Sequence, residues 1–192
     1  ATRAGADGVA RIRRRLNQYK VEIDPNTLGM NGGNIRVARK RLSGGTTIET
    51  RKAPSRSELS EERIRELGVN HEQGNVTDLR EGVGGARYEQ TTGNPLGPST
   101  TEGVDFYDGD TPISLKGPLA RKDTGELLPI NDSMVDGLAD SVVKGAKTNT
   151  ATRDIVVDTL GLSDTQRHRL TERIKGGLEN FDAMPTNIVI LE

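Results

Sequence analysis

The chain has 192 residues, of which 32% are hydrophobic and 3% aromatic, and it contains 23 glycines and no cysteine. This length fits one large domain or two small ones, with a modest core and part of the chain spent on loops or a linker. The lack of cysteine excludes disulfides, thiolate zinc sites and cysteine nucleophiles. No apolar run approaches the ~20 residues that a membrane-spanning helix requires, so we expect no stable membrane span.

The formal net charge of −1 hides an uneven distribution of charge. Residues 1–56 hold 13 Lys and Arg against 4 Asp and Glu, a surplus of nine positive charges, so the remainder carries ten negative charges. Such a division suggests two functional parts with different partners. The basic part could touch phosphate or an anionic membrane surface, or the two halves could simply attract each other. Because the chain starts with Ala1, we expect it to be a piece of a longer or processed protein.

Residues 1–70 are predicted to form a small, basic, mostly helical region. Apolar residues recur at helical spacing over 8–20, beside a cluster of arginines, and predict a short helix. Paired glycines flank 34–42, where we expect a loose hairpin or irregular structure. A capping serine, two acidic residues and a terminal glycine predict a second short helix over 60–68. The polar, glycine-rich stretch that follows places a domain boundary between 68 and 82.

Residues 80–192 are predicted to form an α/β domain with the element order α-β-β-α-β-α-β. The expected elements are helix 80–90 with a bend or interruption at glycines 82–85, strands 103–108 and 111–117, helix 133–145, strand 154–160, helix 163–177 and strand 187–191. The Asp-Gly pair between the first two strands is a hairpin signal. The last β-α-β passage implies a right-handed crossover between parallel strands, and continuous apolar runs suit a sheet covered on both faces. We therefore expect a mixed central sheet flanked by helices.

Three residues of this domain suggest a phosphodiesterase site: Glu89 on a helix, Asp105 on a strand and Lys116 on the next strand. Phosphodiester hydrolysis needs charge neutralised on the phosphate and a water made ready, which a divalent ion can do. Mg²⁺ prefers few carboxylates and several waters, so Glu89 and Asp105 are candidate metal ligands. Ser114 and Lys116 lie two residues apart on a strand and share a face. Lys116 could hold the attacking water and stabilise negative charge, while Ser114 could orient the water or the metal.

Glu89, Asp105 and the Ser114-Leu115-Lys116 segment resemble the PD-(D/E)xK, or restriction-endonuclease-like, nuclease superfamily over about residues 82–192. The resemblance implies that fold, with Glu89 as the helix acid, Asp105 as the strand acid and the serine and lysine at the (D/E)xK position. It also implies a divalent metal cofactor, Mg²⁺ first, with Mn²⁺ or Zn²⁺ as alternatives.

Two departures from the superfamily pattern affect the expected ligand set. Val104 stands where the motif has proline, and Ser114 stands where an acid usually lies. One metal ligand could therefore be missing. Glu102 or Asp108 could compensate for it, or the site could hold a single ion.

The order of a basic region followed by this nuclease-like domain is similar to the C-terminal toxin domains of bacterial contact-dependent growth inhibition proteins. This resemblance implies an entry or translocation region at 1–70 and a nuclease domain at 80–192. It implies a nucleic acid substrate, with transfer RNA preferred over DNA, and a cognate immunity protein as partner. It further implies a secreted or cell-surface effector fragment that is delivered to the cytoplasm of a target cell.

Two other interpretations remain open from the sequence. The chain could be a non-enzymatic binding or structural module whose acidic half docks on a basic partner, with Glu89 a solvated helix residue and Lys116 an edge-strand charge. It could also be a metal-independent ribonuclease that uses His71 or His168 for proton transfer.

Overall fold

The computed structural model describes residues 40–41, 45–71, 73–179 and 186–192. The chain divides into two compact units, 1–34 and 35–192, and all the described residues belong to the second. The helix predicted over 8–20 and most of the hairpin expected over 34–42 lie outside the described residues.

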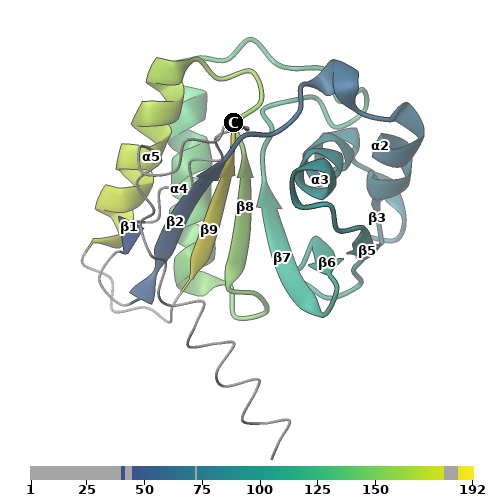
Figure 1. Ribbon diagram of the computed structural model, residues 1–192, viewed down its shortest axis with the longest axis horizontal. Coiled ribbons are helices and arrows are strands. Elements are labelled where there is room, and N and C mark those ends of the chain that lie inside the picture. Colours follow the sequence, from purple (N-terminus) through teal and green to yellow (C-terminus); the bar gives the residue numbers. More distant parts are fainter. Residues whose placement is uncertain (1–39, 42–44, 72, 180–185) are drawn as a thin grey trace, which may run out of the picture. The chain divides into compact units, whose positions relative to one another are not determined.

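A seven-stranded mixed sheet with the order β1-β2-β9-β8-β7-β6-β5 forms the centre of the second unit (Figure 1). Its central strands β2, β9, β8 and β7 are parallel, while β1, β6 and β5 add antiparallel edges. A separate two-stranded ladder joins β3 (Val69–Asn70) to β4 (Val76–Thr77). The strands of the main sheet are β1 (Lys40–Arg41), β2 (Thr47–Arg51), β5 (Leu96–Pro98), β6 (Phe106–Asp108), β7 (Thr111–Lys116), β8 (Asp154–Asp158) and β9 (Asn187–Leu191).

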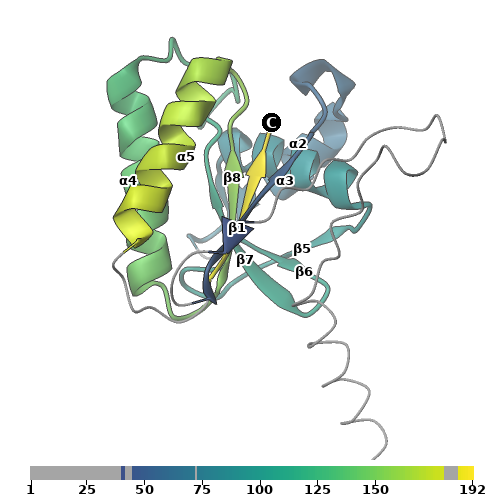
Figure 2. The ribbon, with the colours of Figure 1, turned by 60° about the vertical axis from the view of Figure 1, so that its left-hand side comes forward.

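Helices cover both faces of this sheet, which confirms the expected α/β fold with a mixed central sheet flanked by helices. One face carries α4 (Asp132–Thr148) and α5 (Asp164–Leu178), and the other carries α2 (Glu61–Leu67) and α3 (Leu79–Thr92) (Figures 1 and 2). A short 3₁₀ turn, η3 (Arg56–Glu58), precedes α2. No helix in the described part of the chain is both long enough and apolar enough to cross a membrane.

The central strands supply alternate residues to two cores. Ile155 and Val157 of β8 pack under α4 and α5, whereas Val156 packs under α2 and α3. This division follows from the two-residue period of a strand and explains why the run is apolar without interruption. Helix α5 begins at the predicted capping box, in which the Ser163 and Gln166 side chains each bond the other's backbone.

Helix α3 runs unbroken through its glycines, so the predicted bend or interruption at 82–85 is wrong. The glycines allow neighbouring segments to approach closely. A Cβ on Gly82 would lie 2.1 Å from the carbonyl oxygen of Ile64 in α2, and one on Gly84 would lie 2.8 Å from the side chain of Leu115 in β7. The glycine run that predicted a bend in the helix is therefore the surface through which α3 contacts α2 and β7.

Residues before the predicted domain boundary belong to the same sheet and helical layer as those after it. Strand β2 lies between β1 and β9, with Ile48 opposite Ile188. Arg87 of α3 donates from Nε to the carbonyl oxygen of Pro54, 2.7 Å away. The sequence placed the division between 68 and 82, whereas the compact units divide at 34/35.

A buried ion pair joins α3 to the end of β8. The Arg87 side chain is 2% exposed and its Nη1 donates to Oδ1 of Asp158, whose side chain is 0% exposed. Oδ1 also accepts a hydrogen bond from the N–H of Leu160, while Oδ2 has no hydrogen-bond partner among the described residues. Burial raises the pKa of Asp158, and the Arg87 charge opposes that shift.

Candidate functional site

Three hydrogen bonds join Asp105 to strand β7. Its N–H donates to the carbonyl oxygen of Ile113 (2.9 Å), and its Oδ2 accepts from the N–H of Leu115 (2.6 Å) and from Oγ of Ser114 (3.2 Å). The antiparallel pairing of Phe106 with Ile113 continues to bring Asp105 opposite Ser114. The hairpin thus brings two of the four candidate residues together. Oδ1 of Asp105 accepts no hydrogen bond from the described residues.

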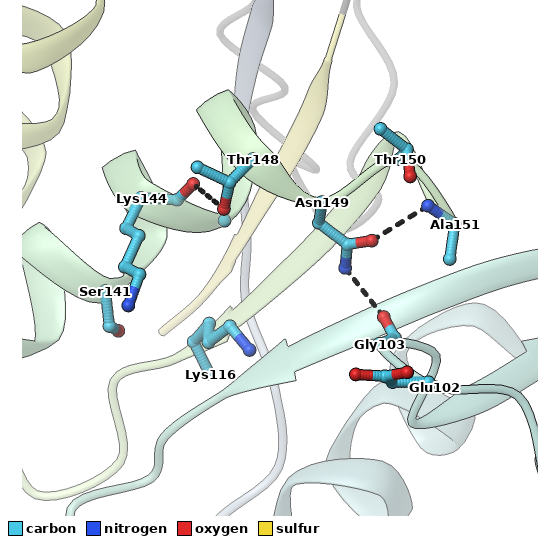
Figure 3. A pocket seen from close by; sticks show the side chains of 10 residues that line it. Glu102, Gly103, Lys116, Ser141, Lys144, Thr148, Asn149, Thr150 and Ala151 are labelled. Atoms are coloured by element: carbon cyan, nitrogen blue, oxygen red, sulfur yellow. Dashed lines mark hydrogen bonds between the residues drawn. The ribbon is translucent and has the colours of Figure 1, made fainter.

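Lys116 lies on the same strand but lines a separate cavity. Ile113 and Leu115 pack in the core under α2 and α3, so Ser114 and Lys116 alternate to the face that α4 covers. Ser114 is 2% exposed, whereas Lys116 is half-buried in the wall of a cavity of about 610 Å³, named the Lys116 cavity (Figure 3). Its other walls come from Ser141, Lys144 and Gly145 of α4 and from residues 102–103 and 148–151.

Glu89 is held by α2 and β5 rather than by the other candidates. Its two carboxylate oxygens accept from Nε (2.9 Å) and Nη2 (2.6 Å) of Arg63, and Oε1 also accepts from the N–H of Leu96 (2.5 Å). The bonds to Glu89 are the largest cause of the raised pKa of Arg63. No hydrogen bond in the described part of the chain joins Glu89 to Asp105 or Lys116.

The carboxylate of α3 that interacts electrostatically with Asp105 is Glu81. Burial is the largest cause of the raised pKa of Glu81, followed by the negative charges of Asp105 and Asp78. A hydrogen bond from Nδ2 of Asn70 to Oε2 (3.2 Å) opposes this shift. Sequence reasoning missed Glu81, although it lies on the same predicted helix as Glu89, eight residues earlier.

Asp105 and Glu81 are the two carboxylates that could hold a divalent cation with few protein ligands. No group of three or more His, Cys, Asp or Glu side chains forms a metal site in the described residues. Mg²⁺ typically takes one or two carboxylates and completes its shell with waters and substrate oxygens. Arg80 offsets part of the Glu81 charge, because its Nη2 lies 3.6 Å from Oε1 of Glu81, and a bound cation would offset the remaining repulsion from Asp105.

Glu102 and Asp108, the two acids that could replace a missing metal ligand at Ser114, have other neighbours. Oδ2 of Asp108 accepts a hydrogen bond from the hydroxyl of Tyr88 (3.1 Å). Glu102 lines the Lys116 cavity and is its single acidic lining residue among those described (Figure 3). Glu102 therefore shares a cavity with Lys116, whereas Asp105 acts on the pKa of Glu81.

One histidine shares a cavity with a candidate residue. His71 and Asp105 both line a cavity of about 250 Å³, together with Arg63 and Glu66. The His71 Nδ1 lies 2.7 Å from Oδ1 of Asn75. His168 is exposed on α5 and lines neither cavity.

No family model, curated protein or solved structure matches this chain.

Proposed function

We propose that the chain is a metal-dependent nuclease with a restriction-endonuclease-like fold. One observation carries the proposal: Oδ2 of Asp105 accepts hydrogen bonds from Ser114 and Leu115 of β7, which leaves Oδ1 without a hydrogen bond from the described residues. The negative charge of Asp105 also contributes to the raised pKa of a second carboxylate, Glu81 of α3. These residues lie within the consecutive elements α3-β5-β6-β7-α4-β8, an order that supports the resemblance. Glu81 takes the place of Glu89 as the helix acid.

Each residue has a specific task in the proposed reaction. The carboxylates of Asp105 and Glu81 would hold the ion, and the hydrogen bonds from Ser114 and the N–H of Leu115 fix Oδ2 of Asp105. A bound divalent ion would neutralise phosphate charge and lower the pKa of a water. In hydrolysis a water oxygen bonds to phosphorus, one P–O ester bond breaks and the leaving oxygen takes a proton.

The substrate strand would cross the segment that separates the two cavities. Glu102 and Gly103 line the Lys116 cavity, while Asp105 and Phe106 line the smaller one. A phosphate on this segment would have the Asp105 carboxylate on one side and the Lys116 ammonium on the other. The ammonium would stabilise the negative charge that develops on the phosphate.

The resemblance to contact-dependent inhibition toxins supports a more specific proposal for the biological role. The substrate would be transfer RNA in preference to DNA, cut inside a target cell, and a cognate immunity protein would block the cut. The basic residues of 1–70 would serve entry.

The test is incubation of the full chain with total transfer RNA or plasmid DNA, with Mg²⁺, Mn²⁺, Zn²⁺ or EDTA. Asp105→Asn, Glu81→Gln and Lys116→Ala should abolish metal-dependent cutting, and Glu89→Gln should retain it. Cutting that survives EDTA would contradict a metal-dependent mechanism. No cutting with any metal, and no rise in melting temperature on adding metal, would favour the binding module.

A metal-independent ribonuclease is a second candidate because His71 shares a cavity with Asp105. An imidazole and a carboxylate in one cavity could act as acid and base on a ribose 2′-hydroxyl. That enzyme would cut RNA alone, resist EDTA and lose activity in His71→Ala. His168→Ala is its matched control.

A further inference from the structure

Lys116 is unusual among the described basic residues because it is half-buried and its side chain makes no ion pair or hydrogen bond with another described residue. It lies on β7, an interior strand between β6 and β8. Every other buried or half-buried Lys or Arg whose side chain the structure describes bonds a carboxylate or a carbonyl oxygen; these are Arg51, Arg56, Arg63, Arg80, Arg87, Arg153, Arg167 and Lys175. Withdrawing a cation from water is costly unless an anion compensates it. The position of Lys116 therefore suits an anion that comes from outside the chain.

A second lysine reaches the same cavity from the helix above. Lys144 of α4 is exposed and also makes no ion pair with the described residues. Figure 3 shows the side chains of Lys116 and Lys144 both extending into the cavity, from β7 and from α4. The hydroxyls of Ser141 and Thr148 donate to backbone carbonyl oxygens of α4, at 2.8 Å and 2.9 Å. The two ammonium groups are therefore its main free donors.

The lining of the cavity suits the nucleic acid backbone rather than the bases. No aromatic side chain lines it, so it offers no surface on which a base could stack. The chain beyond residue 56 carries ten excess negative charges, so a polyanion is attracted only where cations gather locally. Two lysines 28 positions apart in sequence, on a strand and a helix, form such a place.

We infer that the Lys116 cavity binds phosphate groups of the substrate strand next to the cleaved bond, with Lys144 as a phosphate-binding residue outside the reacting centre. This inference rests on the proposed function and extends it, because it assigns to α4 a contact with the phosphate groups of the nucleic acid that does not depend on base sequence.

The test measures binding without cleavage. The full chain carrying Asp105→Asn is titrated in EDTA with labelled single-stranded RNA of two unrelated sequences, at salt concentrations from 0.05 to 0.3 M. Lys144→Gln should lower the slope of log affinity against log salt by about 0.7, which is about fivefold weaker binding at 0.1 M salt. The effect should be equal for both sequences. Lys147→Gln removes the same charge from the same helix outside the cavity lining and should leave the slope unchanged.

Each outcome separates this inference from the proposed nuclease. An unchanged slope for Lys144→Gln, a loss confined to one sequence, or an equal loss for Lys147→Gln overturns the inference, even where the wild type cuts nucleic acid. A slope change specific to Lys144→Gln supports phosphate binding in the Lys116 cavity, and it does so even where no metal yields cutting and the nuclease proposal fails. Thermal unfolding should be the same for the Lys144→Gln variant and its parent, which excludes misfolding as the cause.

Discussion

Replacing Glu89 by alanine tests whether this residue is structural, as its contacts indicate. Glu89→Ala removes a two-point ion pair with Arg63 and a hydrogen bond from the N–H of Leu96. These contacts join α2, α3 and β5, and the Glu89 side chain is only 14% exposed. The variant should therefore lose stability but retain metal-dependent cutting.

The expected loss follows from the two kinds of contact. A hydrogen bond from a backbone N–H to a charged acceptor contributes about 1.5–3 kcal/mol. The side chain of Arg63 is 34% exposed, so solvent screens its ion pair, which contributes up to about 1 kcal/mol. We expect a total loss of about 1.5–4 kcal/mol in the free energy of unfolding. For a chain of this size that loss lowers the melting temperature by about 3–16 °C.

The assay is thermal and urea unfolding of the full chain, combined with cutting measured at a temperature where the variant is folded. Glu126→Ala, which removes an exposed carboxylate with no partner among the described residues, should stay within about 0.5 kcal/mol of the wild type. Glu89→Gln keeps an acceptor for Leu96 and should lose less than Glu89→Ala. A variant as stable as the wild type would refute the structural role. A stable, folded variant that no longer cuts would show that Glu89 acts in catalysis, as the sequence predicted.

Three further substitutions test the packing around the site. Burial and neighbouring carboxylates raise the pKa of Glu81 above 4.5, so the folded state favours the protonated side chain. The stability that this protonated side chain contributes is fully present below pH 4.5 and is lost as pH rises through the folded-state pKa. Glu81→Gln should therefore be more stable than the wild type in urea at pH 7, with no advantage at pH 4; an equal advantage at both pH values would contradict this. Arg87→Met leaves the carboxyl of Asp158 buried without its ion-pair partner, and should lower the free energy of unfolding by about 3–5 kcal/mol, with part regained when Asp158→Asn is added. Gly82→Ala should destabilise α3 despite the helix propensity of alanine, because its Cβ would meet the α2 backbone, whereas exposed Gly137→Ala should gain up to about 1 kcal/mol. Equal effects of the two glycine changes in urea unfolding would refute the close-packing argument.

The sequence predicted the elements that carry their own local signals. Helix α5 has its capping box, and β8 and β9 have continuous β-branched runs. Strand β2 was missed because Thr47–Arg51 shows no clear apolar pattern, and its buried Glu49 is compensated by Arg51, two residues along the strand. Strand β5 has the sequence Leu-Gly-Pro and exists through its pairing with β6. Tertiary contacts determine both strands.

The choice between two acids on one helix lay beyond the sequence for the same reason. Glu81 and Glu89 occupy the same predicted helix, and no periodicity tells which of them faces a strand and which faces another helix. Arg63 lies 26 residues before Glu89 in the sequence and reaches its carboxylate only because α2 packs against α3. Ser114 and Asp105, by contrast, were predictable as neighbours because a tight turn sets the register of their hairpin.

The glycines of α3 link the packing of the helix to the chemistry proposed for the site. Without a Cβ at Gly84, α3 lies directly against the side chain of Leu115, whose own N–H binds Oδ2 of Asp105. Glu81 is three residues before Gly84 and so lies on the same side of the helix. Close packing at the glycine therefore brings the helix carboxylate toward the strand carboxylate, at an electrostatic cost that burial increases. A fold selected for stability alone would separate two such charges, whereas a fold that binds a cation gains from holding them together.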